Sequence, residues 1–369
     1  MFVSVPANAT SRKRRSRWLV AQAKDDDPTR SHAGTKPSLL SSALPFELIV
    51  RLARRAFHTA WLTAMHQLAP QSPRTGEYLR PRSTFFSSHF LTHHPHLTLS
   101  PPDFTLFYGT ACPWCHRTLL ARAFYGLAPS LPLIFCEPSA EGKWLLPPNP
   151  HFSAPDLKGV YRQLSPAYSG RATAPLLIHT ASGTIVSNES SDIVRFLRTL
   201  SPSERRIDLY PDAHQSHIAA DGDRIHHGLN NGVYRAGFAT SQRAYDAACA
   251  DVFDTLDHLE RTLSTHRYVS GTPAPSESDI FLFPTLFRFD TVYHLLFRCS
   301  RKRLTEYPHL HAWMRDMLQT YADHVAPTCD LTGTMASYYR QLFPLNPSGI
   351  VPSADAGDLC RPHGRANLA

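Results

Sequence analysis

The segment Ala111-Cys112-Pro113-Trp114-Cys115-His116 places two thiols and an imidazole in one short stretch of this chain of 369 residues. Three kinds of site use such a stretch. Covalent haem attachment uses C-x-x-C-H, with His116 as the axial ligand. A structural zinc site needs a second pair of ligands, and no other C-x-x-C occurs in the sequence. A nucleophilic or redox thiol needs a helix N-terminus, where free N–H groups lower the pKa of the thiol.

The residues around the motif favour a nucleophilic thiol. Residues 104–108 predict a short buried strand, and Pro113 suits the first turn of a helix that runs to residue 124, because a proline needs no N–H partner there. Cys112 then begins the helix, and we assign it as the catalytic nucleophile. Cys115 lies one turn inside as a possible, dispensable resolving thiol, while His116 and Arg117 add positive charge nearby. No porphyrin pocket is evident in the sequence.

The following segments complete a thioredoxin-like layout over residues 103–200. An apolar run at 131–136 forms a β-α-β unit with the strand and helix before it, which implies parallel strands. Two further apolar runs, at 175–179 and 184–186, flank a Ser-Gly turn and predict a β-hairpin. A helix is predicted after them, from residue 190. The order of elements is therefore β-α-β-β-β-α.

This layout points to ligand-binding positions opposite Cys112. Pro175, preceded by Ala174, stands at the start of the third strand, where a thioredoxin-like fold carries a cis-proline. A cis bond there would expose the backbone of Ala174 to a thiol peptide. Glu189 and Ser190 begin the last helix, where they could bind the α-amino and α-carboxylate groups of a ligand.

The second half of the chain lacks strand patterns and predicts an all-α domain at 205–335. Helices are expected at 212–231, 241–265, 277–298 and 308–322. Ser276 and Asp279 form the S-x-x-D pattern of a capping box. Residues 336–369 are expected to form a proline-containing tail over the surface. The predicted fold class is therefore α+β, with a thioredoxin-like domain before an all-α domain.

The net charge of +8 is concentrated near the start of the chain. Residues 1–24 contain six basic and no acidic side chains, which is typical of an organellar transit peptide, and the near-neutral remainder argues against nucleic-acid binding.

Residues 25–102 form an irregular extension with one amphipathic helix at 44–68, whose charges exclude a membrane span. A patch of four histidines at 89–96 is expected to be a solvated loop. Seven cysteines without a secreted-domain spacing indicate a reducing compartment.

Taken together, the motifs resemble the glutathione transferase superfamily and, within it, the glutathionyl-hydroquinone reductases or xi-class transferases. The resemblance runs from about Gly76 to Pro352. It is carried by segments 112–117, 173–176, 185–191, 230–239, 283–290 and 346–352. The N-N-G-V-Y and R-F-D segments are specific to this class. Cys at position 115 is typical of plant-type members, so the resemblance implies a chloroplast, with mitochondrion or cytoplasm as alternatives.

The resemblance implies that glutathione is the co-substrate and lies along Ala174, Pro175, Glu189 and Ser190. Trp144 would pack on glutathione, although the usual G-W is one residue longer here, as Gly142-Lys143-Trp144. Lys158 replaces the arginine of the usual L-R-x-x-Y near the glycyl carboxylate. Tyr234 and Tyr338 correspond to the tyrosines that bind the hydroquinone. No metal or haem is implied, and the family predicts a homodimer.

The expected reaction removes glutathione from a glutathionyl-hydroquinone. Cys112 attacks the glutathionyl sulfur and forms a mixed disulfide, which a second glutathione releases as glutathione disulfide. Two alternatives remain: a broader thioltransferase or dehydroascorbate reductase on the same fold, and a transferase-like module that binds a partner without catalysis.

Overall fold

The computed structural model describes residues 45–139, 141–149, 152–202, 207–353, 355 and 357–368. The predicted transit peptide at 1–24 lies outside these residues. The chain divides into two units, Met1–Ala56 and Phe57–Ala369, and helix α1 (Phe46–Leu68) crosses the division. In the part of α1 that belongs to the second unit, Met65 is buried and the Trp61 indole donates to the Pro344 carbonyl at 3.0 Å. Among the described residues, no helix has the length and apolar character that crossing a membrane requires.

A four-stranded mixed sheet forms the centre of the first domain. Its order is β2 (Leu133–Phe135), β1 (Phe104–Tyr108), β5 (Leu176–His179) and β6 (Thr184–Ser187). β1 pairs parallel with β2 and antiparallel with β5, and β5 and β6 form the predicted hairpin. The thioredoxin-like prediction is confirmed.

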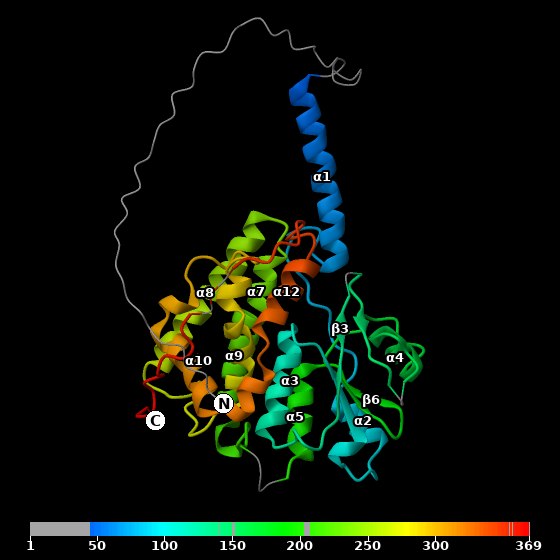
Figure 1. The fold of residues 1–369 in the computed structure, drawn as a ribbon, viewed down its shortest axis with the longest axis vertical. Helices are drawn as coiled ribbons and strands as arrows, with labels where there is room; N and C mark the ends of the chain where they lie inside the picture. Colours follow the sequence, from blue (N-terminus) through cyan, green and yellow to red (C-terminus); the bar gives the residue numbers. More distant parts are fainter. Residues whose placement is uncertain are drawn as a thin grey trace, which may run out of the picture. The chain divides into compact units, whose positions relative to one another are not determined.

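Alternating side chains place this sheet between two apolar clusters. Leu106 and Leu177 face the cluster that contains α3 (Pro113–Phe124) and α5 (Ser190–Leu200). Phe107 and Leu176 face a second cluster with α4 (Leu157–Leu164). Figure 1 shows α3 and α5 running side by side along the sheet. A small hairpin of β3 (Glu137–Pro138) and β4 (Trp144–Leu145) lies outside the main sheet.

The second domain is entirely helical in its described residues, as predicted. It contains α6 (Gln215–Arg224), a π-helical turn (Ile225–Asn230), α7 (Asn231–Gly237), α8 (Gln242–Leu263), α9 (Glu277–Phe287), a second π-helical turn (Phe289–Tyr293), α10 (Pro308–Thr320), α11 (Ala322–Val325) and α12 (Leu331–Gln341). The predicted Ser276–Asp279 capping box is present at the start of α9.

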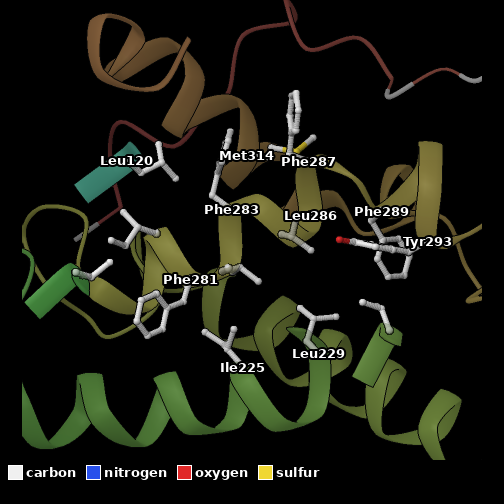
Figure 2. Packing of buried hydrophobic residues seen from close by; sticks show 14 of the residues in the cluster. Leu120, Ile225, Leu229, Phe281, Phe283, Leu286, Phe287, Phe289, Tyr293 and Met314 are labelled. Atoms are coloured by element: carbon white, nitrogen blue, oxygen red, sulfur yellow. The ribbon is translucent and has the colours of Figure 1, made fainter. Parts of the chain in front are cut away.

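Helix α9 is buried along its whole length and forms the centre of the largest apolar cluster. In Figure 2, Phe281 lies toward Ile225, and Phe283 lies toward Met314 of α10. Leu120 of α3 belongs to the same cluster, so the two domains share a continuous core. This shared core fixes the start of α3, and therefore Cys112, against the helical domain.

Three elements differ from the sequence prediction. The helix predicted at 277–298 ends at Phe287: the Arg288 N–H donates to the Thr285 carbonyl at 3.2 Å, the Arg288 side chain donates to the Pro284 carbonyl, and a π-helical turn follows. A helix not predicted, α12, crosses the expected start of the C-terminal tail. The first two histidines of the predicted loop lie on α2 (Ser87–His93), where the exposed rings of His89 and His93 stack 4.1 Å apart.

Candidate active site

Cys112 lies at the N-cap of α3, directly before Pro113 in the first turn. The Ala174–Pro175 peptide bond is cis, as predicted. The Cys112 Sγ donates to the Ala174 carbonyl oxygen at 3.6 Å. The half-buried thiol therefore sits between a helix N-terminus and an extended backbone segment, and both can hold a peptide thiol beside it.

The two thiols of the motif have opposite electrostatic environments. A hydrogen bond from the Cys115 thiol, together with N–H groups of the first turn and the nearby Arg288, lowers the pKa of Cys112 to about 7 despite its burial. Burial raises the pKa of Cys115 well above its ordinary value, and its proximity to Cys112 adds to this effect. Cys112 therefore has a large thiolate fraction at neutral pH, whereas Cys115 stays protonated and can donate to the Cys112 thiolate.

Arg288, at the end of α9, holds the loop before Cys112 from the helical domain. Its guanidinium donates to the carbonyls of Thr110 (2.8 Å), Ala111 (3.1 Å) and Pro284 (2.9 Å), and to the His116 Nδ1 atom (3.0 Å). Arg288 is 1% exposed. This role was not predicted from the sequence, although Arg288 belongs to the R-F-D segment.

His116 is neutral, contrary to the expected positive charge. Burial and the adjacent Arg288 lower the pKa of His116 well below its ordinary value. A guanidinium only donates, so Nδ1 accepts from Arg288, and the Nε2 proton is then donated to the Thr328 hydroxyl at 2.9 Å. Both ring nitrogens are therefore engaged within the protein, and neither is free to ligate a haem iron.

Arg117 is a buried residue rather than a solvated one. Its guanidinium hydrogen-bonds the Asn230 side-chain oxygen and, at 3.5 Å, the Ser190 hydroxyl. The guanidinium lies 4.5 Å from the centre of the Trp114 ring and 4.2 Å from that of Phe281. Asn230, in the N-N-G-V-Y segment, thereby connects the helical domain to the predicted glutathione-binding helix start.

Glu189 is held as an ionised acceptor at the start of α5. It accepts from the Ser83 hydroxyl at 2.7 Å. Burial would raise its pKa, but the Ser83 hydrogen bond and the positive charges of Arg80 and Arg117 hold the pKa of Glu189 below its ordinary value. A carboxylate in this state is suited to binding an ammonium group.

A cavity of about 580 Å³ opens in front of Cys112. It brings together six of the predicted site residues: Cys112, Trp144, Lys158, Ala174, Tyr234 and Tyr338. Cys115, Pro175, Glu189 and Ser190 do not line it. Its other charged side chains are mostly cationic: Arg80, Lys143 and Arg171, with Asp156 as the carboxylate.

Tyrosines from the helical domain form one end of this cavity. The hydroxyls of Tyr234 and Tyr338 lie 2.5 Å apart, and Tyr338 also contacts the hydroxyl of Tyr293 at 3.2 Å. Burial raises the pKa of all three tyrosines, so they stay protonated, and the two that line the cavity, Tyr234 and Tyr338, can donate to an oxygen of a ligand. Tyr293, fully buried behind the other two, was not predicted from the sequence.

Trp144 reaches the site from β4 and packs against Gly109, just after β1. A Cβ atom at position 109 would lie 2.4 Å from the Trp144 ring, so a glycine is required there. Lys158 lies on the exposed side of α4, whose N-cap Asp156 accepts from the Gly159 N–H at 2.8 Å. Within the described ranges, no group of three or more His, Cys, Asp or Glu side chains is placed to hold a metal ion.

Comparison with known proteins agrees with this architecture. The N-terminal glutathione S-transferase domain model matches residues 111–200, and the C-terminal model matches residues 242–316. Glutathionyl-hydroquinone reductase YqjG of Escherichia coli (strain K12) is 38% identical over 270 residues, which cover 70% of this chain and 81% of YqjG. Glutathionyl-hydroquinone reductase PcpF of Sphingobium chlorophenolicum is 37% identical over 268 residues, covering 70% of this chain and 85% of PcpF.

Solved structures give the same result. The glutathione-bound structure of YqjG superposes with a TM-score of 0.66 at 38% identity, covering 71% of this chain and 87% of YqjG. The xi-class transferase of Natrialba magadii superposes with a TM-score of 0.69 at 34% identity, covering 74% of this chain and 86% of the Natrialba chain. The fold and the thiol site define an enzyme of the glutathione transferase superfamily. Within it, the chain belongs to the family of the glutathionyl-hydroquinone reductases and xi-class transferases.

Proposed function

We propose that the protein reduces glutathionyl-hydroquinones to hydroquinones, with Cys112 as the nucleophile. The observation that carries the proposal is the position of Cys112, whose pKa is lowered to about 7, 3.6 Å from the Ala174 carbonyl and in one cavity with Tyr234 and Tyr338. A thiolate beside an aromatic subsite suits attack on a sulfur that is bonded to an aromatic ring.

The proposed reaction has two exchanges at sulfur. The Cys112 thiolate attacks the glutathionyl sulfur and forms an S–S bond while the C–S bond breaks. The electron pair of that bond stays on the ring carbon, which takes a proton, so the aromatic group is reduced by two electrons. A second glutathione thiolate attacks the mixed disulfide, releasing glutathione disulfide and the Cys112 thiolate.

The cavity lining, together with the start of α5, supports a position for each part of the conjugate. The glutathionyl group would lie along Ala174, with Glu189 and Ser190 at its γ-glutamyl end, Trp144 against its backbone and Lys158 near its glycyl carboxylate. The hydroquinone would lie against Tyr234 and Tyr338, whose hydroxyls can donate to its oxygens. In this arrangement Cys115 is a hydrogen-bond donor to Cys112 rather than a required second redox centre.

The test is an assay of the purified protein with glutathionyl-menadiol and glutathione. One hydroquinone and one glutathione disulfide should form per conjugate consumed, and mass spectrometry should find glutathione attached to Cys112. The tyrosine-lined end favours this function over a broader thioltransferase or dehydroascorbate reductase. Faster turnover of hydroxyethyl disulfide or dehydroascorbate, with no reaction of the conjugate, would instead favour that alternative.

We also propose that the protein is a plant-type member of the family, acts in a chloroplast and forms a homodimer. The cysteine at position 115 supports a plant-type member, and the basic, acid-free composition of residues 1–24 supports import into a chloroplast. The family resemblance supports the homodimer. A fluorescent fusion of residues 1–44 should enter plastids, and light scattering should give twice the mass of the chain. Cytosolic or nuclear fluorescence would contradict the transit peptide.

A further inference from the structure

Arg80 helps to keep Glu189 ionised, and it also lines the cavity beside the aromatic residues Trp114 and Tyr234. It is half-buried. Its guanidinium carbon lies 3.8 Å from the centre of the Trp114 ring, and that ring stacks on Tyr234 with 6.2 Å between centres. A guanidinium that stacks by its face keeps its N–H edge available for a ligand.

Arg171 reaches the same end of the cavity from the loop before Ala174. Its guanidinium donates to the Leu68 carbonyl at 3.4 Å, and Leu68 and Tyr78 both line the cavity. Arg80 and Arg171 are both close enough to Tyr78 to oppose the rise of its pKa that burial causes. The Tyr78 ring in turn packs edge-on against Phe238, 5.5 Å between centres. The two arginines therefore share one region of the cavity.

The cavity lining carries more cationic than acidic side chains, and Glu189, which faces Arg80, lies outside this lining. Four cationic side chains line it, Arg80, Lys143, Lys158 and Arg171, against one carboxylate, Asp156, which already caps α4. Neither arginine forms an ion pair with any residue in the described part of the chain. Lys143 and Lys158 can match the glycyl carboxylate of glutathione. The positive potential of the two arginines then remains for another anionic group.

We propose that Arg80 and Arg171 form an anion subsite that selects glutathionyl-hydroquinones bearing a carboxylate on the aromatic ring. The inference rests on the proposed function, since it concerns the aromatic part of that substrate. A carboxylate is planar and can accept two N–H bonds from one guanidinium edge, which gives both affinity and orientation. A ring bound at Tyr234 would lie beside Trp114, on which Tyr234 and Arg80 both stack, so a carboxylate on it would come within reach of the two arginines.

Two substrates that differ only in the charge of one ring substituent test this subsite. The glutathionyl conjugate of 2,5-dihydroxybenzoic acid and that of its methyl ester share the ring and the two hydroxyls. The wild-type kcat/KM should be about tenfold higher for the acid, as expected for a hydrogen-bonded charge pair. Arg80→Gln and Arg171→Gln should each reduce this ratio, and the double variant should bring it near one; the readout is the ratio, because any change in glutathione binding affects both conjugates equally. Arg162→Gln, an exposed arginine on α4 outside the cavity lining, is the matched control and should keep the ratio.

Binding separates this inference from the proposed function. The Cys112→Ser variant cannot turn over, so calorimetry on it measures the affinity for each conjugate directly. Tighter binding of the acid that disappears in Cys112→Ser with both arginines replaced supports the subsite, even if the wild type reduces neither conjugate and the reductase proposal fails. Equal affinities for acid and ester, or a preference that survives the loss of both arginines, would overturn the subsite even if both conjugates are reduced.

Discussion

At the scale of single residues, the hydrogen bond between the two thiols controls the nucleophile. It is the largest of the effects that lower the pKa of Cys112 to about 7. Cys112 alkylation by iodoacetamide should therefore rise with pH to a plateau, with its midpoint near 7. Cys115→Ala removes the donor and should move the midpoint upward, reducing the rate at pH 7 roughly tenfold if the midpoint approaches the ordinary value of about 8.5.

Cys115→Ser is the matched control for this prediction, because a hydroxyl can still donate to the Cys112 thiolate. Its alkylation midpoint and its turnover with glutathione should stay close to those of the wild type. Cys112→Ser should be inactive, because an alcohol is not ionised near neutral pH. If Cys115→Ala and Cys115→Ser both lose turnover with an unchanged midpoint, Cys115 is a redox partner and not a donor.

The hydroxyls of Tyr234 and Tyr338 should affect the aromatic substrate alone. Tyr234→Phe and Tyr338→Phe keep the ring and remove one donor of about 0.5–1.5 kcal/mol, or up to roughly 3 kcal/mol if the bound ring is partly ionised. Thus kcat/KM for a glutathionyl-hydroquinone should fall about two- to hundredfold, while reduction of hydroxyethyl–glutathione disulfide is spared. Tyr293→Phe, behind the cavity lining, should have the smaller effect. Equal loss on both substrates would indicate a structural role.

The sequence predicted this site where a local motif carried the information. Cys112 and Ala174 could be placed because each marks the end of a recognisable element. Arg288 and Tyr293 could not, because their partners lie far away along the chain: Arg288 contacts the Ala111 carbonyl, 177 residues distant, and Tyr293 contacts Tyr338. Glu189 and Ser190 were placed correctly at a helix start, but contacts with Arg117 and Ser83 occupy part of their polar surface.

At the scale of elements, the end of α9 positions the start of α3. Arg288→Met would leave two loop carbonyls and the His116 Nδ1 atom without their donor. We expect a loss of about 2–4 kcal/mol in the free energy of unfolding and a Cys112 midpoint above that of the wild type. Urea denaturation and the alkylation profile measure the two effects. Arg243→Met, an exposed residue of α8, should change neither.

A result in which Arg288→Met lowers stability but leaves the Cys112 midpoint unchanged would assign Arg288 a packing role only. Arg288→Lys provides a further distinction. It keeps a positive charge near Cys112 but cannot donate to all the carbonyl and ring partners of the guanidinium. Its midpoint should therefore lie between those of the wild type and Arg288→Met.

The ends of helices and strands could be predicted where residues close in the sequence form the cap. They could not be predicted where contacts with distant residues determine the end. The strands of the sheet and the capping box of α9 follow from short patterns. Helix α9 ends where Arg288 contacts the distant loop before Cys112, and the apolar periodicity of 277–298 gives no sign of that contact. The N-cap of helix α12 is Asp330, whose carboxylate accepts from the Gly333 N–H at 2.8 Å, but a glycine in the first turn weakens the helical pattern.

At the scale of the whole molecule, the end of the chain returns to the helical domain. Arg365 is 2% exposed, and its guanidinium donates to the carbonyls of Leu263 (2.7 Å), His266 (2.7 Å) and Arg267 (2.9 Å). These carbonyls lie at and beyond the end of α8, where a cation is favoured by the helix dipole. The predicted surface tail thus includes a buried anchor.

Loss of this anchor should reduce stability without affecting catalysis. Arg365→Met leaves three carbonyls without a buried donor and removes the charge that faces Asp316 at 3.9 Å. The free energy of unfolding should fall by about 2–4 kcal/mol, measured as a lower urea midpoint. Because Arg365 lies outside the cavity lining, kcat/KM at 25 °C should change less than about twofold. Arg361→Met, exposed in the same tail, should leave the midpoint unchanged. An unchanged midpoint in Arg365→Met would mean that the tail contributes no stability, and a large loss of kcat/KM would mean that it positions the site.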